Sequence, residues 1–130
     1  MRRKALCFPV VTVVAFLVSS PIFAHHGVAH YDMKKTIVLT GTLTAFDWGN
    51  PHCLVHMDVM DETGHFRHWT LEMASTFAMS KRGWGKDTLK RGDQIIAETH
   101  PAQNGTPLGI SSSPDFALKF VVNGREIPSR

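Results

Sequence analysis

The chain has 130 residues, a length suited to one small domain with a single core, and a formal net charge of +3. That excess equals the three cations Arg2, Arg3 and Lys4, because the rest of the chain carries as many basic as acidic residues. A balanced remainder with no run of basic residues excludes a protein that binds nucleic acid through a basic patch.

The beginning of the chain has the layout of a secretory signal peptide. The cations precede an apolar run over residues 7–18, and Ala24 suits the position before a cleavage site. The run is shorter than the ~20 residues of a membrane-spanning helix, so we expect cleavage and no lasting membrane anchor. We predict a signal peptide at residues 1–24, one small β-barrel domain at residues 25–130, and a periplasmic or secreted protein.

Three strands are predicted next, at residues 36–46, 52–60 and 65–73, where apolar and polar side chains alternate. The apolar face of the first strand should consist of Ile37, Leu39, Leu43 and Ala45. Gly41 in its middle indicates a bulge or a close approach of two backbones. In the second strand Cys53, a small apolar side chain, should face inward, whereas His52 and His56 should share the opposite face.

One helix is predicted after the third strand, because Ser75 or Thr76 can cap its start and Gly83 can stop it. A fourth strand is predicted at residues 94–100, and a fifth at residues 115–122 after a long loop. Three strands, a helix and two strands are the order of the oligonucleotide/oligosaccharide-binding (OB) barrel. We therefore expect a mostly β, five-stranded OB-like barrel with one short helix. A small open sheet with one helix is the alternative.

Several blocks follow one another along the chain: "AHHG", "LTGTLTAFDWGNPH", "HMDVMDETG", "HWTLE", "RGWGKDTLKRGD" and "HPAQNG". In this order they resemble a family of small exported bacterial proteins that is known only as a domain of unknown function, over roughly residues 24–110. The resemblance implies an exported small β-barrel and names no activity or ligand. The segment "LGISSSPDFALKFVV" is longer than the family's usual closing segment, which leaves the place of the fifth strand open.

Cleavage after Ala24 would make His25 the first residue of the exported chain. Its free amine and its ring nitrogen could then chelate one metal ion together. One further imidazole would complete a three-nitrogen set that suits Cu(II). This set is similar to the histidine brace of copper oxygenases and of some periplasmic copper carriers. His52 and His56 are better placed than His26 to supply the third nitrogen.

The predicted metal ligands are His25, His26, His52, His56 and Glu72. His52 and His56 lie about 13 Å apart along their strand, so one ion cannot bind both without a bend. The hairpin could bring Glu72 near either histidine, depending on a register that the sequence leaves open. Each ligand also has a structural interpretation: a frayed terminus, a turn cap, a cross-strand pair or an acceptor at the start of the helix.

The function that we expect is a binding protein for copper or another divalent metal ion, with no catalytic residues. The sequence lacks a nucleophile elbow, a phosphate loop and a zinc-hydrolase helix, which favours binding over catalysis. Two alternatives remain. One is a metal-dependent redox enzyme that uses the N-terminal histidine. The other is a structural domain that binds another exported protein without a metal.

Overall fold

The computed structural model describes residues 26–128. The predicted signal peptide, its cleavage site and His25 lie outside the described residues. Within residues 26–128, no helix has both the length and the apolar composition needed to span a membrane.

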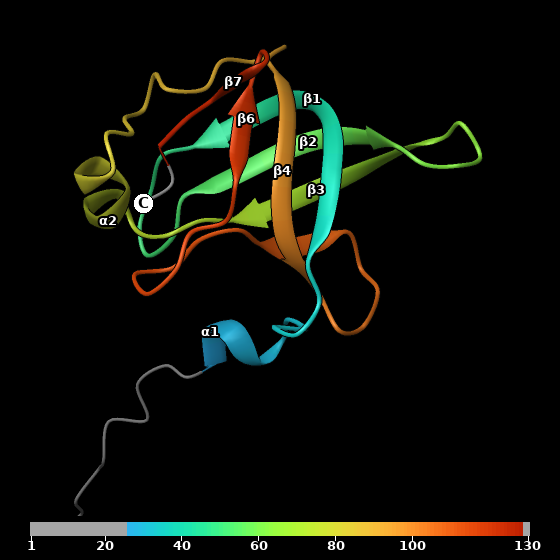
Figure 1. The fold of residues 1–130 in the computed structure, drawn as a ribbon, viewed down its shortest axis with the longest axis horizontal. Helices are drawn as coiled ribbons and strands as arrows, with labels where there is room; N and C mark the ends of the chain where they lie inside the picture. Colours follow the sequence, from blue (N-terminus) through green and yellow to red (C-terminus); the bar gives the residue numbers. More distant parts are fainter. Residues whose placement is uncertain (1–25, 129–130) are drawn as a thin grey trace, which may run out of the picture.

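Five strands close into a barrel (Figure 1): β1 (Ile37–Asp47), β2 (Leu54–Met60), β3 (Phe66–Glu72), β4 (Gln94–Pro101) and β5 (Leu108–Ile110). The order β1-β2-β3-β5-β4 returns to β1, because β4 pairs with β1 as well as with β5. All of these pairings are antiparallel except that of β3 with β5, which is parallel. The arrangement confirms the predicted five-stranded, OB-like barrel in a mostly β protein.

The predicted helix is α2 (Thr76–Lys81), between β3 and β4. Its N-cap is Ser75, whose hydroxyl accepts a hydrogen bond from the backbone N–H of Ala78 at 3.3 Å. Gly83 follows the helix with a positive φ of 84°, a conformation that glycine adopts without strain. A second helix, α1 (His26–Ala29), was not predicted.

The predicted fifth strand at residues 115–122 is wrong over most of its length. The strand that closes the barrel is β5, in the segment predicted as a loop, and only β6 (Phe120–Val122) falls within the predicted range. The hydroxyl of Ser113 accepts hydrogen bonds from the backbone N–H groups of Asp115 and Phe116, at 3.1 and 3.3 Å. This turn takes both residues out of extended structure. A two-residue strand, β7 (Arg125–Glu126), pairs with β6.

The inward face of β1 changes along the strand. Leu39 and Leu43 are buried as predicted, but the register with β2 shifts between Leu43 and Ala45. This bulge turns Ala45 outward and Phe46 toward the core, so the prediction for Ala45 is wrong. Gly41 marks a close approach rather than the bulge itself, since a Cβ atom there would lie 2.2 Å from the carbonyl oxygen of Asp58.

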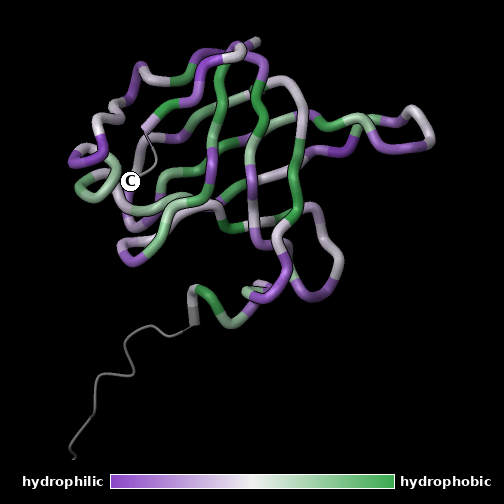
Figure 2. Tube along the Cα trace, viewed as in Figure 1, coloured by the Kyte–Doolittle hydropathy of each residue, from purple (hydrophilic) through white to green (hydrophobic). Residues whose placement is uncertain are grey.

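The core fills the barrel and continues under α2. Cys53 and its neighbours on the same face of β2 are buried, as predicted, and the alternation of hydrophobic and hydrophilic residues is visible along the strands in Figure 2. Trp84 closes one end of the core, where its ring packs against Phe46 and Phe120 with centroids 6.2 and 5.3 Å away. Its indole N–H donates to the carbonyl of Pro128 at 2.6 Å.

Candidate functional site

The hairpin of β2 and β3 places His56 and Glu72, two of the predicted ligands, on one outer face. Its register pairs Leu54 with Glu72, His56 with Thr70 and Asp58 with His68. These positions alternate with buried residues of the core, so their side chains share the opposite face. This register was open in the sequence, and it determines which of the predicted ligands meet.

His52 and Glu72 meet where β2 begins and β3 ends. The Nε2 atom of His52 lies 3.2 Å from Oε1 of Glu72. The Nδ1 atom of the same ring lies 3.2 Å from the carbonyl oxygen of Met73, which can only accept a hydrogen bond. We infer that Nδ1 carries a proton. The Nε2 lone pair then faces a carboxylate, and the contact is favourable only with a second proton or a metal cation between the two atoms.

Tyr31 occupies the other oxygen of Glu72. Its hydroxyl donates a hydrogen bond of 2.6 Å to Oε2 of Glu72. The Tyr31 side chain is buried at the end of the barrel, and its backbone forms an antiparallel bridge with Ala102. Burial, the hydrogen bond and the charge of Glu72 raise the pKa of Tyr31 above its ordinary value of 10.0. Glu72 therefore holds Tyr31 and His52 with different oxygens.

His56, the other predicted strand ligand, is held by partners other than Glu72. Its Nδ1 atom is 3.0 Å from the Thr70 hydroxyl, and its Nε2 atom is 3.0 Å from Oδ2 of Asp47. Both ring nitrogens thus have partners. His68 pairs with Asp58 instead of joining His52 or His56.

The segment that begins at His26 is joined to the same end of the barrel by Tyr31. His26 begins α1, and Tyr31 follows it by five residues. In Figure 1, α1 lies outside the barrel, connected to the start of β1. The helix rises only about 1.5 Å per residue, so the chain from the start of α1 to Tyr31 is short. Through its hydrogen bond, Tyr31 joins this segment to Glu72.

Within residues 26–128, no three His, Cys, Asp or Glu residues come together closely enough to hold a metal ion. His52 and Glu72 supply two donors, and any further donor must come from elsewhere. The buried thiol of Cys53 does not join them, because it contacts the carbonyl of Gly49 at 3.7 Å. Burial raises the pKa of this thiol, which agrees with its interpretation as a small core side chain.

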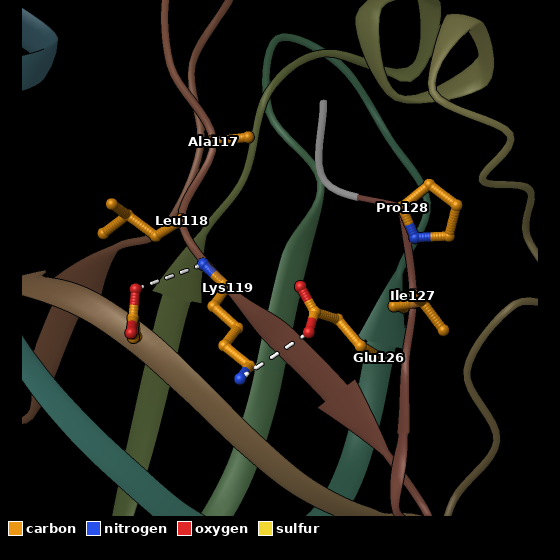
Figure 3. Close-up of a pocket in the computed structure, with 7 residues that line it drawn as sticks. Ala117, Leu118, Lys119, Glu126, Ile127 and Pro128 are labelled. Atoms are coloured by element: carbon orange, nitrogen blue, oxygen red, sulfur yellow. Dashed lines mark hydrogen bonds and ion pairs between the residues drawn. The ribbon is translucent and has the colours of Figure 1, made fainter.

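A separate surface groove of about 780 Å³ lies between β4, the segment before β6, and β7 (Figure 3). Lys119 spans it: its backbone N–H donates to Glu98 at 3.4 Å, and its Nζ atom lies 3.6 Å from Glu126. Ala117, Leu118, Ile127 and Pro128 supply the remaining lining. None of the predicted metal ligands lines this groove.

Sequence reasoning missed Tyr31 and Asp47, the partners of Glu72 and His56. One signal was available for Tyr31, which is the chain's single tyrosine and follows His30 directly. Asp47 carried no comparable signal, since acidic residues at the end of a strand are common in turns.

The comparisons with known proteins agree with the resemblance seen in the sequence. A model described as a family of unknown function (DUF6152) matches residues 13–111, a region that includes the whole barrel and both His52 and Glu72. The strands β6 and β7 follow the matched region, as do all the residues that line the groove of Lys119 except Glu98. No curated protein and no solved structure matches the chain.

Proposed function

We propose that the chain, which belongs to the family of unknown function DUF6152, is an exported protein that captures Cu(II) or another divalent metal ion. The family itself supplies no activity. The proposed site is the end of the barrel where His52 meets Glu72. The layout of residues 1–24, which is that of a secretory signal peptide, supports the export part of this proposal.

The observation that carries this proposal is the geometry of the His52–Glu72 pair. Nitrogen and oxygen ligands bind a small divalent ion at about 2.0–2.2 Å, so two adjacent ligands of one ion lie roughly 3 Å apart. The Nε2–Oε1 distance of 3.2 Å has this size. The contact of Nδ1 with the Met73 carbonyl also matches metal sites, where the second ring nitrogen of a ligating histidine donates to a carbonyl or a carboxylate.

The remaining donors are assigned to the N-terminus. Cleavage after Ala24 would expose the amine of His25 beside its own imidazole, and Tyr31 connects the segment after it to Glu72. Amine, imidazole and carboxylate donors together suit Cu(II), which prefers tetragonal nitrogen and oxygen ligands. His26 is an additional candidate donor. His56 is a weaker one, since Thr70 and Asp47 already contact both of its nitrogens.

The proposal is tested by measuring Cu(II) affinity in competition with a chelator, using protein purified after export. His52→Ala and Glu72→Gln should each weaken binding at least tenfold, because each removes one ligand. His68→Ala is the matched control: it removes an exposed histidine of the same hairpin, bound to Asp58, and should leave the affinity unchanged. Equal affinities for all four proteins would show that His52 and Glu72 form only an ordinary ion pair.

Two further measurements separate this function from its alternatives. If the copper-loaded protein consumes oxygen in the presence of a reductant, the same site belongs to a redox enzyme. Exported protein that contains no metal, and takes none up, would favour a structural domain that binds another exported protein.

A further inference from the structure

We propose that Tyr31 and Gln103 are positioning residues: Tyr31 makes Glu72 a one-oxygen ligand, and Gln103 holds the residues that lead to Tyr31 at this end of the barrel. This inference deepens the proposed function and rests on it. It concerns which ions the site accepts and how the residues from Ala29 to Asp32 are held at this end of the barrel.

Tyr31 determines how Glu72 can bind an ion. The tyrosine hydroxyl holds Oε2 at 2.6 Å, so that only Oε1 faces His52, at 3.2 Å from its Nε2 atom. The Glu72 side chain is only 17% exposed, so water has little access with which to replace this hydrogen bond. A carboxylate held in this way binds through one oxygen. Ca²⁺ takes six to eight oxygen ligands and often binds carboxylates through both oxygens, so Tyr31 selects against it.

Gln103 holds the segment that leads to Tyr31. Its side-chain amide donates to the carbonyls of Ala29 and Tyr31, at 3.3 and 3.1 Å, and its backbone N–H donates to the carbonyl of His30 at 2.9 Å. These carbonyls lie at and just beyond the end of α1, where a helix leaves such groups without internal partners. Because a four-residue helix is too short to be stable alone, contacts of this kind must hold it.

The turn after β4 completes the attachment. The backbone N–H of Asp32 donates to the carbonyl of Pro101 at 2.8 Å, and Tyr31 bridges Ala102. The segment is therefore fixed to residues 101–103 on one side and to Glu72 on the other. An attachment made before the ion arrives removes part of the ordering cost of binding, which is how preorganisation raises affinity.

The test compares Tyr31→Phe and Gln103→Ala with the unaltered exported protein, and Gln94→Ala is the matched control. Gln94 is an exposed glutamine of β4 whose amide contacts Thr42 and the carbonyl of Gly92, far in sequence from the N-terminal segment. Two quantities are measured: the Cu(II) affinity and the electron paramagnetic resonance spectrum of bound Cu(II). A circular dichroism spectrum verifies that each variant is folded.

Tyr31→Phe should weaken Cu(II) binding about tenfold, reduce the preference for Cu(II) over Ca²⁺, and change the copper spectrum, because Glu72 becomes free to rotate. Gln103→Ala should also weaken binding, because the residues that lead to Tyr31 are held less firmly. It should keep the spectrum, since every ligand of the ion remains. Gln94→Ala should change neither quantity. If Tyr31→Phe fails to fold, the exposed Gln103→Ala variant still decides the outcome.

The outcomes distinguish the two levels of the proposal. Copper binding that is unchanged in affinity and spectrum by both substitutions overturns this inference and leaves the proposed metal capture standing. Absence of Cu(II) binding by the unaltered protein overturns both.

Discussion

Replacing Gly41 with alanine should force β1 and β2 apart. Gly41 pairs with Val59 of β2 and with Ile95 of β4, so it lies inside the sheet rather than at an edge. A Cβ atom at this position would lie 2.2 Å from the carbonyl oxygen and 3.0 Å from the carbonyl carbon of Asp58. Both are backbone atoms, which cannot rotate away as the end of a flexible side chain could.

The size of the effect follows from the overlap. Ordinary van der Waals contacts of a Cβ atom begin at 3.4 Å, so the strands would have to separate by about 1 Å at this point. Adding a methyl group to a well-packed site costs about 1–3 kcal/mol, and a backbone obstacle places Gly41→Ala near the upper end. The smaller entropy of the unfolded alanine chain returns about 0.4–1 kcal/mol. We therefore expect a net loss of about 2 kcal/mol.

The free energy of unfolding is measured by urea denaturation followed by circular dichroism. Gly49→Ala is the matched control, because nothing lies within 4 Å of its added Cβ atom and its φ is not positive. The control should change stability by less than about 1 kcal/mol. A Gly41→Ala protein as stable as Gly49→Ala would refute the close approach of β1 and β2.

Three other results are expected. Tyr31 is the chain's one tyrosine, so tyrosinate absorbance reports it alone. Its pKa is raised in the folded protein, so its contribution to stability is complete below pH 10. That contribution is lost as the pH rises through the higher pKa of the folded state. Glu72→Gln should move this titration to lower pH, and an ordinary titration near pH 10 in the folded unaltered protein would contradict the buried contact. Cys53, with its thiol pKa raised by burial, should react with a thiol reagent only after unfolding, and rapid labelling of the folded protein would argue against its place in the core. Gly109→Ala should destabilise the barrel, because the new Cβ atom would lie 2.3 Å from the Thr99 hydroxyl. Adding Thr99→Ala should recover part of the lost stability, and strictly additive changes in the free energy of unfolding would rule out this contact.

The elements that the sequence predicts well are those with many alternating residues. The segments 36–46, 52–60 and 65–73 show alternation, and each overlaps almost completely with a barrel strand of seven or more residues. The cap at Ser75 is equally local, since the hydroxyl reaches an N–H only three residues later. Such signals depend on neighbours in the chain, so they can be recognised without the tertiary structure.

The closing strand β5 has too few residues for this kind of signal. Its three residues include Gly109, and its place depends on pairing with both β3 and β4. The bulge in β1 is similar, because the tertiary contacts of Phe46 decide that Ala45 faces outward. Periodicity cannot reveal either feature.

The contacts of the candidate site also differ in how far the sequence predicts them. The meeting of His52 with Glu72 was foreseeable as one outcome of a hairpin, whose register the structure supplies. The contact of Tyr31 with Glu72 joins residues 41 positions apart, and it depends on the closure of the barrel beside Ala102. No spacing in the sequence points to it.

The central claim, that the exported chain captures copper with an N-terminal histidine and the His52–Glu72 pair, is tested most directly by adding one alanine before His25. Two exported forms are compared by Cu(II) titration and electron paramagnetic resonance: one that begins at His25, verified by intact mass, and one with the extra alanine. The alanine removes the free amine from the His25 chelate and leaves every imidazole and Glu72 in place. We predict a loss of affinity of at least tenfold and a changed copper spectrum. Equal affinities with identical spectra would contradict the claim.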